Sequence, residues 1–154
     1  TDVDNLIDSW PPKNINKAQL DGIEAEISTQ VLGWTHKLNG NLLSPKDRLT
    51  NERLIRRADK TMSYDLFRAF GAFDLGGTVL AQSDRPDIIY DEQWNQVPVK
   101  VNGFVTLDFR TAYHIDKNWM ISGKLNNILD KHYQTVSNYN MADRNFFLSI
   151  HYNN

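Results

Sequence analysis

The chain has 154 residues, a length that suits one ordinary domain, and its 17 Lys and Arg against 19 Asp and Glu give a net charge of −2. This balance excludes a strongly basic nucleic-acid-binding domain and an acidic solvating tail. The chain has no Cys, which excludes a disulfide framework, a thiolate metal site and a cysteine nucleophile.

Hydrophobic residues make up 40% of the sequence and the mean hydropathy is −0.54. No window approaches the ~18 consecutive apolar residues of a membrane helix. A membrane β-barrel remains compatible, because its strands alternate in polarity and average out in hydropathy. Residues 1–8 lack the basic and then apolar layout of a signal peptide, so we expect a mature, processed or partial chain.

Apolar and polar residues alternate along most of the chain, which predicts strands rather than helices. The pattern is clearest near the end, where Phe146, Leu148, Ile150 and Tyr152 share one face. The helix formers within 49–66 leave a helix there as an alternative, although the alternation from Ala58 onward favours a strand. The predicted strands, about eight in number, are 3–7, 19–29, 34–42, 58–66, 74–82, 104–114, 119–126 and 146–152.

The connections between these strands alternate in length. The short ones are 31–33, 69–72 and 115–118, and the long polar ones are 8–17, 43–55, 83–101 and 129–143. If neighbouring strands are antiparallel, all short turns lie at one end and all long loops at the other. This asymmetry is typical of outer-membrane barrels, and on loop lengths alone a soluble β-sandwich is equally compatible.

Aromatic residues shift the balance toward a membrane barrel. Trp34, Tyr113, Trp119 and Tyr152 lie on the apolar faces of their strands, next to the short turns. A ring of Trp and Tyr at one height is what a lipid interface selects, whereas the alternative is the rim of a sandwich core. The prediction is an all-β, antiparallel up-and-down meander of about eight strands, with a transmembrane β-barrel favoured over a sandwich. We expect one outward apolar surface to contain Leu107, Phe109, Ile121, Leu125, Leu148 and Ile150.

Few residues suggest catalytic or metal chemistry. The histidines have no metal-like spacing, although His114 and His151 could approach each other on the polar face. Glu24 and Glu26 share a face, but no nucleophile or partner base accompanies them. Residues 84–87 (DRPD) resemble a turn and lack the regular oxygen spacing of a calcium loop. We therefore predict that the chain is not an enzyme and holds no cofactor or metal.

Two adjacent glycines, Gly76 and Gly77, interrupt one predicted strand. They lack the lysine and the spacing of a phosphate-binding loop. They fit a strand that a neighbour approaches closely.

Three motifs in chain order carry a resemblance: 17–26 (KAQLDGIEAE), 54–58 (LIRRA) and 124–133 (KLNNILDKHY). Together with the final amphipathic strand, they resemble the C-terminal barrel of TonB-dependent outer-membrane receptors. The strings 3–8 (VDNLID) and 130–136 (DKHYQTV) are similar to the vitamin B12 (cobalamin) receptor branch. The resemblance covers essentially the whole chain, although such barrels usually end in an aromatic residue and this one ends in Asn153-Asn154.

The resemblance implies a barrel of about 22 strands, plugged by an N-terminal domain, in the outer membrane of a Gram-negative bacterium. Residues 1–154 would then be the C-terminal barrel segment, with the plug domain and earlier strands absent. The implied function is recognition and TonB-powered import of a scarce nutrient, cobalamin or otherwise a siderophore. The alternative is a soluble all-β binding module, lectin-like or lipocalin-like; a β-rich hydrolase is a weaker possibility because no nucleophile can be nominated.

The resemblance also suggests ligand-binding residues. In the cobalamin branch the first Arg of the Arg-Arg-Ala string faces the corrinoid, which corresponds to Arg56, and a Tyr of the last loop corresponds to Tyr139. A Tyr of the preceding large loop corresponds more loosely to Tyr90. Guanidinium and phenol groups can donate to the amide carbonyls on a corrinoid rim. The alternative is that Arg56 anchors a loop by an ion pair and Tyr139 anchors the membrane interface.

The expected partners follow from the same interpretation. They are a corrinoid or siderophore ligand, outer-membrane lipid, and TonB only through regions N-terminal to this chain; nucleic acid is not expected. The first and last strands would be unpaired edges, which favours closure on each other or self-association. A closed eight-stranded barrel is too narrow for a corrinoid, so we expect the isolated 154 residues to bind cobalamin weakly or not at all.

Overall fold

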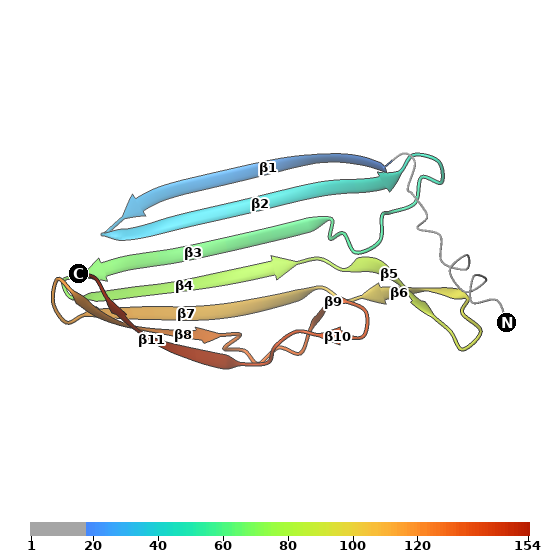
Figure 1. Cartoon of the computed structure of the whole chain (residues 1–154). Coiled ribbons are helices and arrows are strands. Elements are labelled where there is room, and N and C mark those ends of the chain that lie inside the picture. Colours follow the sequence, from blue (N-terminus) through green and yellow to red (C-terminus); the bar gives the residue numbers. More distant parts are fainter. Residues whose placement is uncertain (1–17) are drawn as a thin grey trace.

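The computed structural model describes residues 18–154, so the predicted strand 3–7 and loop 8–17 lie outside the described residues. Seven strands form one antiparallel sheet in the order β1-β2-β3-β4-β7-β8-β11. Figure 1 shows them side by side in a single curved layer. Their bounds are β1 Ala18–Val31, β2 Trp34–Asp47, β3 Lys60–Phe70, β4 Phe73–Gln82, β7 Phe104–His114, β8 Trp119–Asn126 and β11 Asn145–Tyr152.

The antiparallel meander is confirmed, because each predicted strand within the described residues corresponds to one strand of this sheet. Residues 49–59 form turns, an isolated bridge and irregular chain, and β3 begins at Lys60, so the helix alternative for 49–66 is wrong. No helix within residues 18–154 is long and apolar enough to cross a membrane.

The long loops contain strands that the sequence interpretation missed. The predicted loop 83–101 is wrong for most of its length, because β5 Arg85–Tyr90 and β6 Gln96–Val101 pair as a hairpin. The expected turn at 84–87 is therefore a strand from Arg85 onward. The last loop contains a second small hairpin, β9 Gln134–Val136 with β10 Tyr139–Asn140, and β2 extends five residues further than expected, from 43 to Asp47.

The two ends of the sheet differ as predicted (Figure 1). Leu32 and Gly33, both with positive φ (51° and 78°), turn β1 into β2 in two residues. Positive φ at both central positions is the geometry of the hairpin turns that suit twisted strands. The other short turns join β3 to β4 and β7 to β8, and the long loops within residues 18–154 lie at the opposite end.

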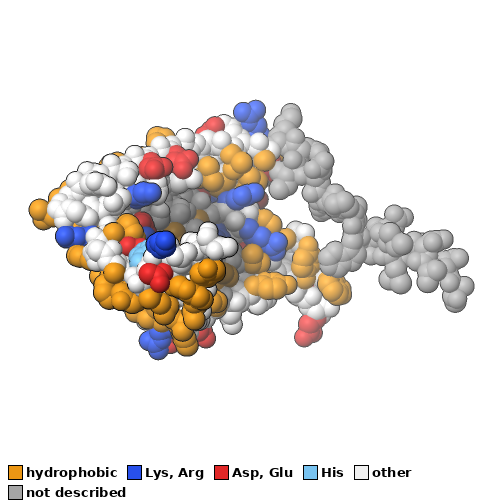
Figure 2. Space-filling model, turned by 60° about the vertical axis from the view of Figure 1, so that its left-hand side comes forward, with side chains coloured by type: hydrophobic (Ala, Val, Ile, Leu, Met, Phe, Trp, Pro, Cys, Tyr) orange, Lys and Arg blue, Asp and Glu red, His pale blue; other side chains and the backbone are white. Residues whose placement is uncertain are grey.

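The strand register separates an apolar outer face from a polar inner face. Phe109 lies opposite Leu125, which lies opposite Phe146, and the six residues predicted to share one outward surface all fall on this face. Val101 and Phe104 are the buried hydrophobic residues of the described chain. Within residues 18–154, no second large sheet packs on the main sheet to bury its apolar face. The sandwich alternative is therefore wrong, and Figure 2 shows hydrophobic side chains gathered at the surface in the lower part of the view.

Aromatic side chains on the outer face meet in pairs at the short-turn end. Ring centroids lie 5.6 Å apart for Trp34 and Phe70, 4.6 Å for Phe73 and Tyr113, and 4.7 Å for Trp119 and Tyr152. We call these six residues the aromatic band. Its members come from β2, β3, β4, β7, β8 and β11, so the band runs across the strands at the short-turn end of the sheet.

On the inner face, Arg110 of β7 reaches across β4 to Asp65 of β3. Two parallel bonds join them, Nη1 to Oδ2 at 2.7 Å and Nη2 to Oδ1 at 2.8 Å, and Thr78 Oγ1 also donates to Asp65 at 2.7 Å. The guanidinium passes over Gly76, where a Cβ atom would lie 2.7 Å from Arg110 Nε. The prediction that a neighbour approaches this glycine closely is confirmed.

Candidate functional site: the ligand-facing loops

Three segments far apart in sequence meet at the long-loop end of the sheet. They are the β2–β3 connection (48–59), the β5–β6 hairpin, and the last loop with β9 and β10 (127–144). Together we call them the loop cluster. Its centre is Asp87 in β5, whose side chain is fully buried.

Asp87 accepts hydrogen bonds from each part of the cluster. Its Oδ1 accepts from Arg56 Nε at 2.8 Å and from the backbone N–H of Ile88 at 2.9 Å. Its Oδ2 accepts from the backbone N–H of Ser137 at 2.8 Å. A single carboxylate therefore joins residues that are 31 and 50 positions away in the chain.

The charge state of Asp87 follows from these donors. Burial alone raises the pKa of its carboxyl, but the N–H groups of Ser137 and Ile88 and the Arg56 guanidinium outweigh burial. The net effect lowers the pKa of Asp87 below its ordinary value of 3.8, so the carboxylate stays ionised at neutral pH.

Arg56 is fixed at both its backbone and its side chain. Its φ of 60° is unusual for a residue other than Gly, and its N–H donates to the carbonyl of Pro86 at 2.7 Å. The side chain nevertheless stays 51% exposed, and its two Nη groups have no partner within the described residues. Arg56 therefore anchors a loop, as the alternative interpretation expected, and keeps donors that a ligand can use.

Tyr139 and Tyr90 lie at different distances from this centre. Tyr139 is 72% exposed in β10, two positions after Ser137. Tyr90 is the last residue of β5, three positions beyond Asp87 and so about 10 Å further along the hairpin. Gln96 Nε2 donates to its hydroxyl at 3.3 Å and its ring lies 6.3 Å from Trp94. The structure thus brings Arg56 close to the segment that carries Tyr139, and it places Tyr90 at the hairpin tip.

A second set of ionic contacts holds the base of the hairpin. Arg53 Nη2 lies 2.9 Å from Asp59 Oδ2, and Arg53 Nη1 lies 3.6 Å from Asp84 Oδ2. Lys100 Nζ of β6 lies 3.6 Å from the same Asp84 oxygen. The β2–β3 connection is therefore bound to the hairpin at two points, Asp84 and Asp87.

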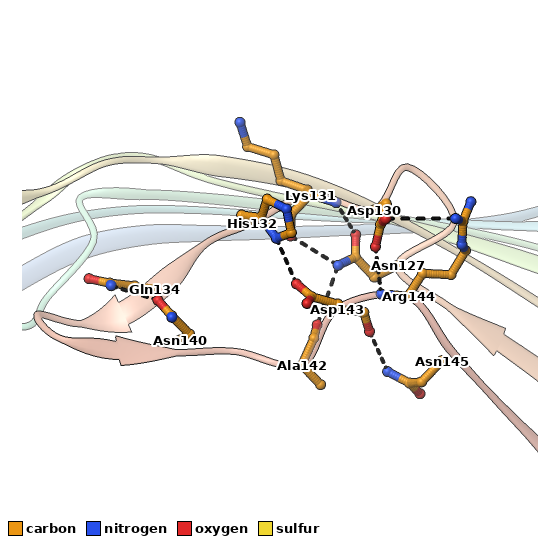
Figure 3. Close-up of polar contacts among 10 residues, drawn as sticks. All are labelled: Asn127, Asp130, Lys131, His132, Gln134, Asn140, Ala142, Asp143, Arg144 and Asn145. Carbon is orange, nitrogen blue, oxygen red and sulfur yellow. Dashed lines mark hydrogen bonds and ion pairs between the residues drawn. The ribbon is translucent and has the colours of Figure 1, made fainter.

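The last loop is closed by Asn127, which Figure 3 shows between Lys131 and Ala142. Asn127 is 4% exposed; its Oδ1 accepts from Lys131 N–H at 2.9 Å and its Nδ2 donates to the Lys131 carbonyl at 3.0 Å and the Ala142 carbonyl at 3.4 Å. Asp130 Oδ1 accepts from the backbone N–H of Arg144 at 2.9 Å. Side chains of the string NNILDKHY thus hold the beginning and the end of the last loop together by hydrogen bonds.

A polar cavity of about 320 Å³ lies between β6 and this last loop. Its lining includes the cationic or titratable side chains of Lys100, Lys131 and His132, and no Asp or Glu. Lys100 and His132 have acidic partners outside the lining, since His132 Nδ1 lies 2.7 Å from Asp143 Oδ1. The cavity is small and favours an anionic or oxygen-rich group.

The remaining candidate residues do not form a site. His114 Nε2 lies 2.8 Å from Asp74 Oδ2, and His151 Nε2 lies 3.3 Å from Ser122 Oγ. Within residues 18–154 no group of three or more metal-ligating side chains gathers. Glu24 and Glu26 lie on the inner face opposite the asparagines of β2.

Asp87 is the residue of the candidate site that sequence reasoning missed. The sequence places it in a polar turn, although the alternation of Val97, Val99 and Val101 could have revealed β6 and so the hairpin. No local pattern indicates that its carboxylate would accept bonds from two distant loops.

Comparison with known proteins agrees with this fold. The sequence model of the family described as TonB dependent receptor-like, beta-barrel, matches residues 1–128. The ferripyoverdine receptor of the Pseudomonas aeruginosa outer membrane, bound to ferripyoverdine, is similar with a TM-score of 0.74 and 20% identity; the match covers 97% of this chain and 22% of that one.

Two other structures show the same fold. A variant of the ferric enterobactin receptor PfeA from Pseudomonas aeruginosa has a TM-score of 0.75 at 19% identity, covering 90% of this chain and 23% of that one. The copper transporter OprC has a TM-score of 0.73 at 18% identity, covering 88% and 24%. The chain therefore spans between a fifth and a quarter of the length of these structures.

The family match covers most of the chain, and the sheet has the short turns, long loops and apolar outer face of an outer-membrane barrel. Proteins of this family are transporter receptors of the Gram-negative outer membrane, not enzymes. The chain belongs to the TonB-dependent receptor β-barrel family.

Proposed function

We propose that this chain is the ligand-recognising C-terminal part of a transporter that imports a scarce metal-chelate nutrient, powered through TonB. Contact with TonB is assigned to parts of the receptor outside this chain. The single observation that carries the proposal is the Asp87 carboxylate, which holds the Arg56 loop and the Ser137 segment together at the long-loop end. Binding residues commonly lie on loops that a rigid scaffold positions.

The first candidate cargo is cobalamin. The support is the resemblance of the residue strings VDNLID and DKHYQTV to the cobalamin receptor branch. Arg56 and Tyr139 would donate to the amide carbonyls of the corrinoid rim, and the ring of Tyr139 would pack on its apolar edge. Tyr90 at the hairpin tip would extend the same contact surface.

The second candidate cargo is a ferric siderophore. It is supported by the cavity lined by Lys100 and Lys131, which suits one anionic group at the rim of a larger chelate. Two structures of similar fold are named for ferripyoverdine and ferric enterobactin. Both cargos are bulky metal chelates with an oxygen-rich rim, so the loop cluster suits either one chemically.

The test is equilibrium binding to the full-length receptor that contains this chain. Cyanocobalamin, ferripyoverdine and ferric enterobactin are titrated in parallel against wild type, Arg56→Ala and Tyr139→Ala. Each variant is expected to lose about 1–2 kcal/mol of affinity for the true cargo through lost hydrogen bonds. Arg57→Ala is the matched control, because Arg57 is an exposed neighbour of the same charge, and it should bind as wild type does.

The outcomes separate the possibilities. Binding of cobalamin alone supports the first cargo, and binding of a siderophore alone supports the second. Unchanged affinity in both variants removes Arg56 and Tyr139 from the site. Failure to bind any of the three chelates contradicts the proposed cargo class.

A further inference from the structure

Arg68 is an unexpected cation on the apolar outer face. The register places it opposite Leu75, whose neighbours on that face include Gly77 and Val79. Within the described residues it is the one Lys or Arg on the outer face in the short-turn half of the main sheet. A charge on the lipid-facing side of a barrel is destabilising near mid-membrane and becomes tolerable only near the interface.

The contacts of Arg68 place its guanidinium at that interface. The guanidinium carbon lies 4.3 Å from the ring centre of Phe70 and 5.8 Å from that of Trp34, both in the aromatic band. It also reaches Gly33 in the β1–β2 turn, where a Cβ atom would lie 3.3 Å from Arg68 Cζ. The side chain therefore extends back toward the strand ends, to the level of the short turns.

The partners of Arg68 are aromatic faces and a glycine, and none is an anion. Arg53, Arg56, Arg110 and Arg144 each have a carboxylate within 4 Å, whereas Arg68 has none within the described residues. The guanidinium N–H donors stay unused, because a ring face attracts the positive charge but does not take the place of a hydrogen-bond acceptor. A half-buried, charged donor fork at a lipid interface thus lacks its acceptor.

We infer that Arg68, with Trp34, Phe70 and Gly33, forms a binding site for the headgroup phosphate of a phospholipid in the leaflet at the short-turn end. A phosphodiester fits the planar guanidinium through two parallel N–H···O bonds. The rings of Trp34 and Phe70 hold the fork in place and lie at the level of the glycerol and upper acyl chain. This site lies on the outer face and is independent of the loop cluster and its cargo.

The missing side chain at Gly33 makes room for this arrangement. Its φ of 78° suits the two-residue turn, and its bare Cα lets the guanidinium lie against the backbone of the turn. A larger residue there would push Arg68 away from the short-turn level.

The experiment uses the full-length receptor in detergent micelles, titrated with short-chain phosphatidylglycerol and followed by native mass spectrometry. Wild type is expected to retain one lipid that Arg68→Gln binds about tenfold more weakly, as expected for one lost charge-assisted contact. Arg68→Lys keeps the charge and loses the fork, so it should bind with intermediate affinity. Phe70→Leu removes the ring under the guanidinium and should also weaken the binding.

Two controls make the result decisive. Lys117→Gln removes a cation from the β7–β8 turn at the same end of the sheet and should leave binding unchanged. Diacylglycerol, which has the acyl chains without the phosphate, should not occupy the site. Equal lipid retention by wild type and Arg68→Gln, an equal loss in Lys117→Gln, or equal binding of diacylglycerol would each overturn the inference.

Discussion

The Nε of Arg56 donates to Oδ1 of Asp87 at 2.8 Å, and this bond joins the β2–β3 connection to the β5–β6 hairpin. The other oxygen of Asp87 binds the Ser137 segment of the last loop. Arg56 is half exposed and Asp87 is buried, so the pair has a ligand-accessible side and a structural side. The strength of this link decides how firmly the candidate contact residues are held before a ligand arrives.

The first prediction concerns Asp87→Asn. The Asn side chain keeps the shape of Asp, but its NH₂ group replaces one accepting oxygen and faces an N–H donor. We therefore expect the free energy of local opening at Ser137 to fall by about 1.5–3 kcal/mol. Hydrogen exchange of the Ser137 and Ile88 amides in the full receptor measures this. Asp91→Asn is the control, because Asp91 caps only the hairpin tip through Asn95 and Gln93. Equal protection in both variants would show that Asp87 does not hold the cluster.

The second prediction concerns acid. The folded pKa of Asp87 lies below its ordinary value of 3.8, so its contribution to stability is present above that value and is lost as the pH falls through the folded pKa. We expect protection of the Ser137 amide, corrected for intrinsic exchange, to be constant from about pH 5 to pH 8, because the carboxyl is ionised throughout that range. Protection should fall below about pH 4. Asp87→Asn should lack this acid-dependent step. A step of the same size in that variant would assign it to another carboxylate.

The third prediction concerns Gly76→Ala on the inner face. A Cβ atom 2.7 Å from Arg110 Nε must displace the guanidinium, which can move only by losing its bonds to Asp65. We expect a cost of about 1–3 kcal/mol, read from the thermal unfolding of the full receptor. Gly40→Ala is the matched control, since a Cβ atom there meets nothing within 4 Å. Equal stability of the two variants would contradict a structural role for the Arg110–Asp65 pair.

The fourth prediction concerns the outer face. Leu148 is 71% exposed within this chain, and Leu148→Arg near mid-strand should cost about 2–4 kcal/mol when that surface meets hydrocarbon. Equilibrium unfolding in phospholipid vesicles measures the cost. Ser149→Arg places the same side chain on the inner face and should cost much less. If the two variants are equally stable, the outer face is not in contact with lipid.

The sequence determined the strands of the main sheet, their faces and the unequal ends, because alternation of polarity is a local property that each strand carries by itself. Residues such as Phe109, Leu125 and Ile150 could be assigned to one outward surface before any contact was known. The β5–β6 hairpin was missed because its two six-residue strands lie within 83–101, a long polar stretch that indicates a loop.

Only the tertiary structure decided how the loops are joined. Asp87 meets Arg56 and Ser137, which are 31 and 50 residues away, and no periodicity encodes a contact at that separation. The same holds for Arg110, which needs both the bare Cα of Gly76 and the carboxylate of Asp65 on another strand. Local alternation determines which face a side chain takes, whereas the register between distant strands and loops determines which side chain it meets there.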